Sequence, residues 1–279
     1  MRAQLSLMML FLGGCEVLSP GIEGSNGPWR AVEPVDIDRF EQVVDTRSLS
    51  DYEAGHLPGA LHLSAGSLQG WVDGVASQAL DSDVALQEMW EAGVDPRRST
   101  LVYGGTNDIP SGRIFWSLAY YGADRDLGLL NGGVGAWIDD GRDLEVGSPP
   151  RFEGTFPETM VRESLRVDQQ YMLDHLEDPN VLYVDARSPN EFAAGHIPGA
   201  INVNWTNLLS ADGQFIAPSA IRDLHPTNGA EVVVIYCQAG ARAAVSWSAL
   251  AWAGFEDVRV YDGSWNEWGA DPDTPKATL

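Results

Sequence analysis

The sequence predicts an α/β protein of two tandem domains, each built on a parallel sheet that carries helices on both faces. The length of 279 residues is that of two ordinary domains. A motif of the first half recurs in the second half, which indicates an internal duplication. Within each half, short apolar runs alternate with helical stretches, which is typical of parallel sheets.

The duplication rests on two matching segments with the same internal spacing. Asp45 and His56 in the first copy correspond to Asp185 and His196 in the second, with equal separation. A match of this length does not arise by chance in a chain of ordinary complexity. The paired segments are residues 44–48 (VDTRS) with 184–188 (VDARS), and residues 53–60 (EAGHLPGA) with 193–200 (AAGHIPGA).

The repeat sets the expected domain boundaries. We expect a first domain over residues 33–145, a linker rich in Gly and Pro over 146–159, and a second domain over 160–279. In the first domain, Ser82 is expected to cap a helix that runs through Trp90. Ser111 is expected to cap another that runs to Tyr120.

The most informative stretch lies in the second half. Residues 232–236 (VVVIY) are a continuous apolar run that predicts a buried parallel strand. Residues 243–253 predict a helix that ends at Gly254. Cys237 lies between them, at the carboxyl end of the strand, where α/β sheets place ligands.

Cys237 is therefore the candidate nucleophile. Backbone N–H groups of the loop and the dipole of the following helix favour an anion such as a thiolate. The alternative is a buried structural thiol, because free cysteine is among the most buried residue types. The candidate active-site loop consists of Gln238, Ala239, Gly240, Ala241 and Arg242, of which the last adds a fixed positive charge.

The two halves differ where chemistry is expected. Gly104 stands in the first half where Cys237 stands in the second, so we expect one active site per chain. Residues 129–133 correspond to residues 260–264 further along. The first domain is expected to form a wall of the groove between the domains. Arg113, which follows Gly104, is a candidate to point into that groove.

Asp185 and Arg187 are expected to pair beneath the loop as supporting residues. Asp45 and Arg47 occupy the same places in the half without the cysteine, which favours a structural role.

Composition excludes several classes of function. The chain has 17 basic and 40 acidic residues and a net charge of −23, which argues against nucleic acid and anionic membrane surfaces as partners. The histidines show no metal-ligand spacing, so we expect no metal. The only cysteines, Cys15 and Cys237, each have a separate explanation, and no disulfide is predicted.

The N-terminus has the pattern of a secretory signal. A basic residue and a short apolar run precede Cys15, and residues 12–15 (LGGC) resemble the lipobox of bacterial lipoproteins. We expect a signal peptide over residues 1–14, lipidation at Cys15 and a flexible tether over 15–32. The lipid anchor would place the protein on the periplasmic side of the cell envelope, with the outer membrane mildly preferred. The alternative is a cytoplasmic protein with an apolar start.

Three segments together resemble the tandem-domain rhodanese family of sulfurtransferases. Residues 52–60 and 192–200 look like the N-terminal signature of rhodanese domains. Residues 261–268 (YDGSWNEW) resemble the C-terminal signature of the tandem enzymes, and residues 237–242 occupy the position of the active-site loop. The resemblance implies an inactive first domain and a catalytic second domain. It also implies transfer of a sulfane sulfur from thiosulfate or 3-mercaptopyruvate, through a persulfide on Cys237, to cyanide or a thiol. The reaction that the resemblance implies needs no cofactor.

The donor remains open. Thiosulfate is preferred because Arg242 resembles the loop of bacterial thiosulfate enzymes. However, Gln238 and Ala239 match neither subtype, and Asn190 and Glu191 stand where some relatives carry a second substrate-binding arginine. A phosphatase of the related fold would need Cys-x5-Arg, whereas this loop reads Cys-x4-Arg. The other alternative is a membrane-tethered persulfide carrier or binding module without turnover. We expect a monomer.

Overall fold

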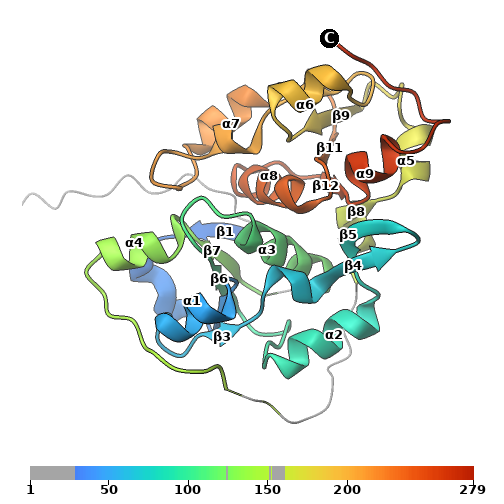
Figure 1. The fold of residues 1–279 in the computed structure, drawn as a ribbon. Helices are drawn as coiled ribbons and strands as arrows, with labels where there is room; N and C mark the ends of the chain where they lie inside the picture. Colours follow the sequence, from blue (N-terminus) through green and yellow to red (C-terminus); the bar gives the residue numbers. More distant parts are fainter. Residues whose placement is uncertain (1–28, 124, 151, 153–160) are drawn as a thin grey trace, which may run out of the picture.

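The computed structural model describes residues 29–123, 125–150, 152 and 161–279 (Figure 1). The predicted signal peptide, Cys15 and most of the predicted linker lie outside the described residues. Within the described ranges, no helix is long and apolar enough to span a membrane.

Each domain contains a five-stranded parallel sheet, which confirms the predicted fold class. The first sheet has the order β1-β7-β6-β2-β3 and the second has the order β8-β12-β11-β9-β10. The two orders are equivalent strand by strand, as a duplication requires. The first sheet consists of β1 Trp29–Val32, β2 Gln42–Asp45, β3 Leu61–His62, β6 Thr100–Tyr103 and β7 Leu127–Leu130. The second consists of β8 Arg166–Val167, β9 Val181–Asp185, β10 Ile201–Asn202, β11 Val232–Tyr236 and β12 Val258–Tyr261.

The prediction of a tether over residues 15–32 is wrong at its C-terminal end. Residues 29–32 form β1, which pairs in parallel with β7 at the edge of the first sheet. The end of this strand is buried, with Val32 in the core, so its apolar residues are held by packing that the local sequence does not reveal.

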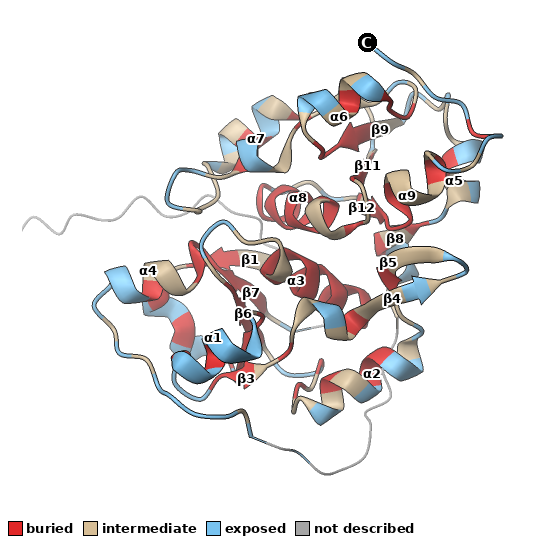
Figure 2. Cartoon of the chain, in the orientation of Figure 1, coloured by how far each residue is buried: buried red, intermediate tan, exposed pale blue. Residues whose placement is uncertain are grey.

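Helices cover both faces of each sheet, as predicted, and the strands between them are buried (Figure 2). In the first domain they are η1 Pro34–Arg39, α1 Leu49–Ala54, η2 Ala65–Leu68, α2 Ser82–Glu91, α3 Pro110–Tyr120 and α4 Gly133–Asp139. In the second they are η3 Glu163–Leu165, α5 Gln169–Asp174, α6 Pro189–Ala194, η4 Trp205–Leu208, α7 Pro218–Leu224, α8 Ala241–Trp252 and α9 Ser264–Trp268.

Two predicted helix caps are wrong by one or two residues. Asp81, not Ser82, is the extended residue before α2. Pro110 opens α3 because its fixed φ suits the first helical turn, so Ser111 lies inside the helix. The hydroxyl of Ser111 donates to Asp108 instead of capping. The strand over 232–236 and the helix ending before Gly254 are confirmed.

A short antiparallel hairpin was not predicted. It comprises β4 Gln69–Val72 and β5 Val75–Ala79, and belongs to the first domain by sequence. It reaches the second domain, where the Ala79 N–H donates to Asp262 Oδ2 at 2.6 Å. The hairpin thus carries first-domain backbone to the end of β12.

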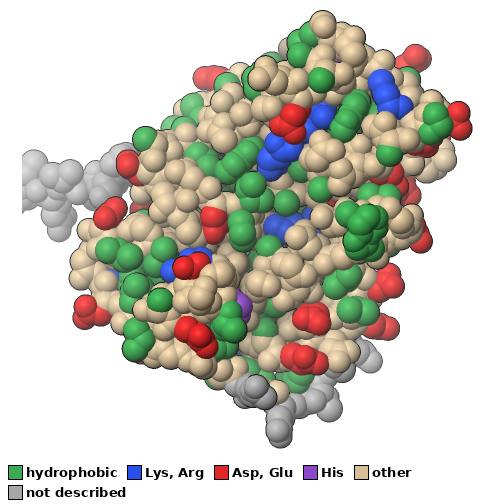
Figure 3. Space-filling model, in the orientation of Figure 1, with side chains coloured by type: hydrophobic (Ala, Val, Ile, Leu, Met, Phe, Trp, Pro, Cys, Tyr) green, Lys and Arg blue, Asp and Glu red, His purple; other side chains and the backbone are tan. Residues whose placement is uncertain are grey.

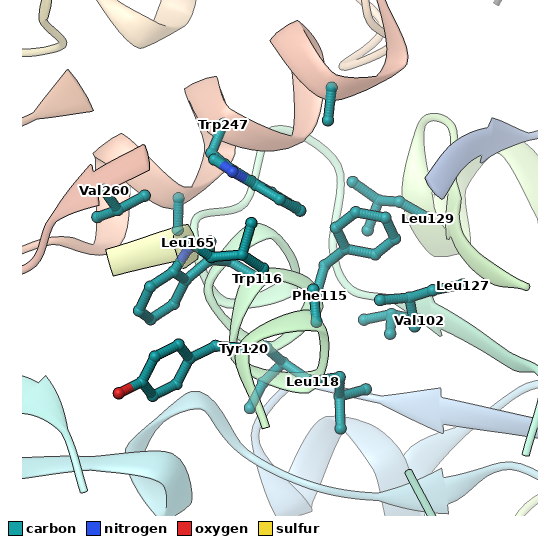
Figure 4. Packing of buried hydrophobic residues seen from close by; sticks show 14 of the residues in the cluster. Val102, Phe115, Trp116, Leu118, Tyr120, Leu127, Leu129, Leu165, Trp247 and Val260 are labelled. Carbon is teal, nitrogen blue, oxygen red and sulfur yellow. The ribbon is translucent and has the colours of Figure 1, made fainter. Parts of the chain in front are cut away.

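The domains meet along α3 and α8, which pack against each other. A Cβ on Gly112 of α3 would lie 2.6 Å from a methyl of Val245 in α8, so the helices approach at a glycine. Trp247 of α8 and Phe115 of α3 have ring centroids 6.2 Å apart (Figure 4). One apolar core therefore runs through both domains.

Candidate active site

Cys237 lies at the carboxyl end of β11, immediately before α8, as the sequence predicts. Its side chain is free and only 1% exposed. Gly240 has a φ of +77°, a left-handed conformation that lets the loop turn sharply into the helix. This turn places Cys237 just before α8, and Arg242 in the first turn of that helix interacts with the Cys237 side chain.

Ser264 holds this loop and was not recognised as a site residue from sequence. Its Oγ accepts the N–H groups of Cys237 and Gly240, each at 3.1 Å. The N–H of Trp265 donates to the Cys237 carbonyl at 3.0 Å. The beginning of α9 thus fastens the loop from the side. The available signal was the position of Ser264 in the segment that resembles the C-terminal family signature.

These contacts correct the simple picture of a loop whose N–H groups all face the sulfur. The N–H groups of Cys237 and Gly240 bind Ser264, and that of Ala241 donates to the Ala239 carbonyl at 3.0 Å. Gln238 is also engaged, because its side-chain amide donates to Asn266 Oδ1 at 2.7 Å. These backbone N–H groups therefore hold the loop in its conformation and are not free to bind the sulfur.

Arg242 forms a two-point ion pair with Glu191 of α6. The two N–O distances are 2.9 and 2.8 Å. The hydrogen bonds from Arg242, assisted by those of Ser188, lower the pKa of Glu191 to about 2. The same hydrogen bonds raise the pKa of Arg242, with a further contribution from a charge on Cys237. Arg242 thus lies beside Cys237, as predicted, but its charge is matched by a carboxylate.

Asp185 and Arg187 pair at 2.7 Å, and Arg187 also donates to the Gly195 carbonyl. The first domain repeats this geometry in full at Asp45 and Arg47, with a separation of 2.6 Å. The predicted structural role is favoured by this repetition. In the second domain the guanidinium also lies 4.5 Å from the ring of Trp265, which links the pair to α9.

Arg113 reaches the domain boundary but does not line an open groove. It is fully buried and pairs with Asp262, immediately after β12. Arg113 therefore points to the domain boundary, as suggested, but is buried there in contact with Asp262. Burial arises because α3 packs directly on α8.

The corresponding loop of the first domain is occupied by its own carboxylate. Asp108 accepts the N–H of Gly105 at 2.5 Å, and it accepts the N–H and hydroxyl of Ser111 at 3.1 and 2.6 Å. A Cβ on Gly104 would overlap Asp108 Oδ2. A cavity at the domain boundary adjoins this loop and is lined by Asn131 and, from the second domain, Phe215. A cysteine at position 104 would therefore require the Asp108 side chain to move.

The surface matches the composition. Acidic side chains are spread over the face shown in Figure 3, with fewer basic ones among them. An anionic substrate would therefore approach through an unfavourable overall field and depend on local contacts.

The rhodanese-like domain family matches the chain twice, over residues 32–140 and 168–271. The chain therefore belongs to the rhodanese family and has two rhodanese-like domains in tandem.

Relatives of similar length carry different names. The chain is 30% identical over 241 residues to the sulfur carrier protein TtuD of Thermus thermophilus, covering 78% of this chain and 84% of that protein. It is 32% identical over 239 residues to a thiosulfate sulfurtransferase of Corynebacterium glutamicum, covering 78% of each. It is 28% identical over 263 residues to a 3-mercaptopyruvate sulfurtransferase of Escherichia coli O157:H7, covering 85% and 92%.

Among solved structures, the fold is similar to that of YnjE. The TM-score is 0.77 at 22% identity, and the match covers 89% of this chain and 68% of YnjE. This likeness supports the fold assignment.

Proposed function

We propose that this protein is a sulfurtransferase that moves a sulfane sulfur from thiosulfate, through a persulfide on Cys237, to cyanide or a thiol. The observation that carries the proposal is the Cys237 loop, which is built at the end of β11 and fastened by Ser264 in the second domain. The names of relatives from Thermus, Corynebacterium and Escherichia all concern sulfur transfer or carriage, which supports the class of reaction.

The reaction has two balanced steps. The Cys237 thiolate attacks the outer sulfur of thiosulfate, a new S–S bond forms, and the bond to the sulfonate sulfur breaks with its electron pair leaving as sulfite. The acceptor then attacks the terminal sulfur of the persulfide. With cyanide, thiocyanate leaves and the Cys237 thiolate is regenerated.

The loop supplies electrostatic stabilisation to both anionic states of the sulfur. Cys237 lies at the N-terminus of α8, a helix of 12 residues, where the helix dipole favours negative charge. Arg242 lies beside the sulfur, and Glu191 holds its guanidinium in place while offsetting part of its charge. We therefore expect the helix dipole and Arg242 to stabilise the thiolate and the persulfide as anions.

The test compares thiosulfate and 3-mercaptopyruvate as donors to cyanide, using the full-length protein with Cys237→Ser as control. Thiocyanate formation from thiosulfate that is lost in the variant would support the proposal. Faster turnover with 3-mercaptopyruvate would move the protein to the sister activity. A folded protein inactive with both donors would contradict the enzymatic proposal.

A second candidate is a persulfide carrier without efficient turnover of small donors. The ion pair between Arg242 and Glu191 favours it, because the charge that a thiosulfate dianion would meet is already matched. The near-complete burial of Cys237 would also protect a stored persulfide. A carrier would show a mass increase of one sulfur atom on Cys237 that persists in the presence of cyanide.

We further propose that the protein is lipid-anchored through Cys15 in the bacterial cell envelope. The proposal rests on the signal-like pattern of residues 1–15. Incorporation of a labelled fatty acid that is lost in Cys15→Ser would support it. Recovery of unlabelled protein in the cytoplasmic fraction would contradict it.

A further inference from the structure

A fully buried ion pair crosses the domain boundary beneath the catalytic loop. Arg113 of α3 in the first domain places Nη1 2.5 Å from Oδ1 of Asp262 in the second domain, and both side chains are 0% exposed. The other carboxylate oxygen of Asp262 accepts the Ala79 N–H of the hairpin at 2.6 Å. Two separate parts of the first domain therefore converge on one carboxylate.

The pair lies directly against the backbone of the loop. A Cβ on Gly240 would overlap Asp262 Oδ1 and lie 2.8 Å from Arg113 Nη1. Asp262 also stands two positions before Ser264, whose hydroxyl binds the N–H groups of Cys237 and Gly240. The ion pair thus supports the loop at Gly240 and the residue that fastens it.

The equivalent contact beside the Gly104 loop of the first domain can be compared with the contact beside the Cys237 loop. Asn131 occupies the position of Asp262 in the first domain, and it accepts the N–H of Phe215 from the second domain at 2.8 Å. Ser246 lies nine residues after Cys237, just as Arg113 lies nine residues after Gly104. On the side without a cysteine, the neutral Asn131 therefore makes the cross-domain contact that Asp262 makes with the Ala79 N–H. Ser246, which corresponds to Arg113, has no hydrogen-bond partner for its hydroxyl among the described residues.

Docking of the domains does not by itself explain the charges. A buried ion pair is costly to desolvate and is often no more stabilising than a neutral replacement. The contact between Asn131 and Phe215 shows that this fold docks its domains with a neutral acceptor. The charged pair occurs on the side where a sulfur anion must be stabilised, and a rigid cradle matters for that chemistry.

We infer that Arg113 is a positioning residue for the Cys237 loop, contributed by the non-catalytic domain and acting through Asp262 and Gly240. The inference rests on the proposed reaction at Cys237. It assigns the first domain a part in building the active site in addition to covering it.

The decisive variant gives the catalytic side the residues found at the equivalent positions 246 and 131, as Arg113→Ser with Asp262→Asn in the full-length protein. Asn131→Ala is the matched control, because it removes the equivalent cross-domain acceptor beside the loop without a cysteine. We expect the double variant to keep a cooperative thermal transition. We expect its kcat for thiosulfate to fall at least about tenfold, with KM within about twofold, as displacement of a catalytic group predicts.

Hydrogen exchange of the amides in residues 237–242 supplies a readout that does not depend on turnover. We expect these amides to exchange at least about tenfold faster in the double variant and at the wild-type rate in Asn131→Ala. Only the double variant removes the contact that supports residues 237–242. The single variant Arg113→Lys keeps the positive charge beside Asp262, so its kcat is expected to lie between those of the double variant and the wild type.

A folded double variant with wild-type kcat and wild-type exchange would overturn the inference. Equal losses in Asn131→Ala would also overturn it, because the pair would then serve domain docking alone. An inactive wild-type protein would instead contradict the proposed function, and the exchange measurement would still decide the role of Arg113.

Discussion

The hydroxyl oxygen of Ser264 lies 3.1 Å from the backbone nitrogen of Cys237 and holds the backbone of the proposed nucleophile in place. Ser264 adopts a φ of +56°, which is unfavourable for a residue with a side chain. The equivalent residue of the first domain is Gly133, which has a φ of +62° without that cost. The second domain therefore keeps a strained serine where the hydroxyl has a partner at the active-site loop.

Replacing Ser264 by Gly is expected to lower activity by at least about tenfold. The change relieves the backbone but leaves two buried N–H groups without their acceptor, at about 1–3 kcal/mol each before relaxation. Sulfur transfer and thermal unfolding would be measured together. Ser248→Ala is the control, since that buried hydroxyl donates to the Ala244 carbonyl of its own helix, α8. Equal effects of the two substitutions would argue against a special role for Ser264.

Gly240→Ala is expected to abolish most activity, because its Cβ would overlap Asp262 Oδ1 at a φ of +77°. Gly199→Ala is matched in conformation, with a φ of +80° and no atom within 4 Å of the added carbon. Both should lose about 1–2 kcal/mol of unfolding free energy from the backbone conformation. Only Gly240→Ala should also lose turnover. Normal turnover in that variant would show that the loop tolerates a shift of Asp262.

The pairing of Glu191 with Arg242 predicts a specific pH dependence of stability. The pKa of Glu191 is lowered from 4.5 to about 2, so the pair stabilises the folded state fully above pH 4.5 and loses its contribution as the pH falls towards 2. Denaturant unfolding between pH 5 and about pH 2 should therefore show a smaller decline for Glu191→Gln than for the wild type. Parallel curves would indicate that the pair does not contribute.

Glu191→Gln also tests whether the positive charge of Arg242 contributes to thiosulfate binding. Removing the carboxylate leaves Arg242 without its anionic partner, so KM for thiosulfate should fall by at most about fivefold, the range of a partly exposed ion pair. Steady-state kinetics at constant ionic strength would measure the change. A raised KM would instead show that Glu191 serves substrate binding by orienting Arg242.

A cysteine at position 104 is not expected to create a second active site. In a Cys237→Ser background, Gly104→Cys would force its Cβ onto the Asp108 carboxylate, which is bound by Gly105 and Ser111. We expect reduced stability and no persulfide on the introduced thiol by mass spectrometry after exposure to thiosulfate. A persulfide at that position would show that Asp108 moves aside easily.

The sequence alone determined the duplication, the α/β class and the position of Cys237, the proposed nucleophile. Each depends on local information: the repeated Asp–His spacing, the apolar run over 232–236, and the position of Cys237 between a strand and a helix. Arg242 was also expected beside the sulfur, because it belongs to the same short loop.

Only the tertiary structure decided what these residues contact. Glu191 meets Arg242, Ser264 meets Cys237, and Arg113 meets Asp262 across separations of 51, 27 and 149 residues. Such pairings depend on strand order and on how α3 packs against α8, which no periodicity of the chain encodes. The physical reason is that hydrogen bonds and ion pairs require contact between atoms, and the folded core brings these distant residues together.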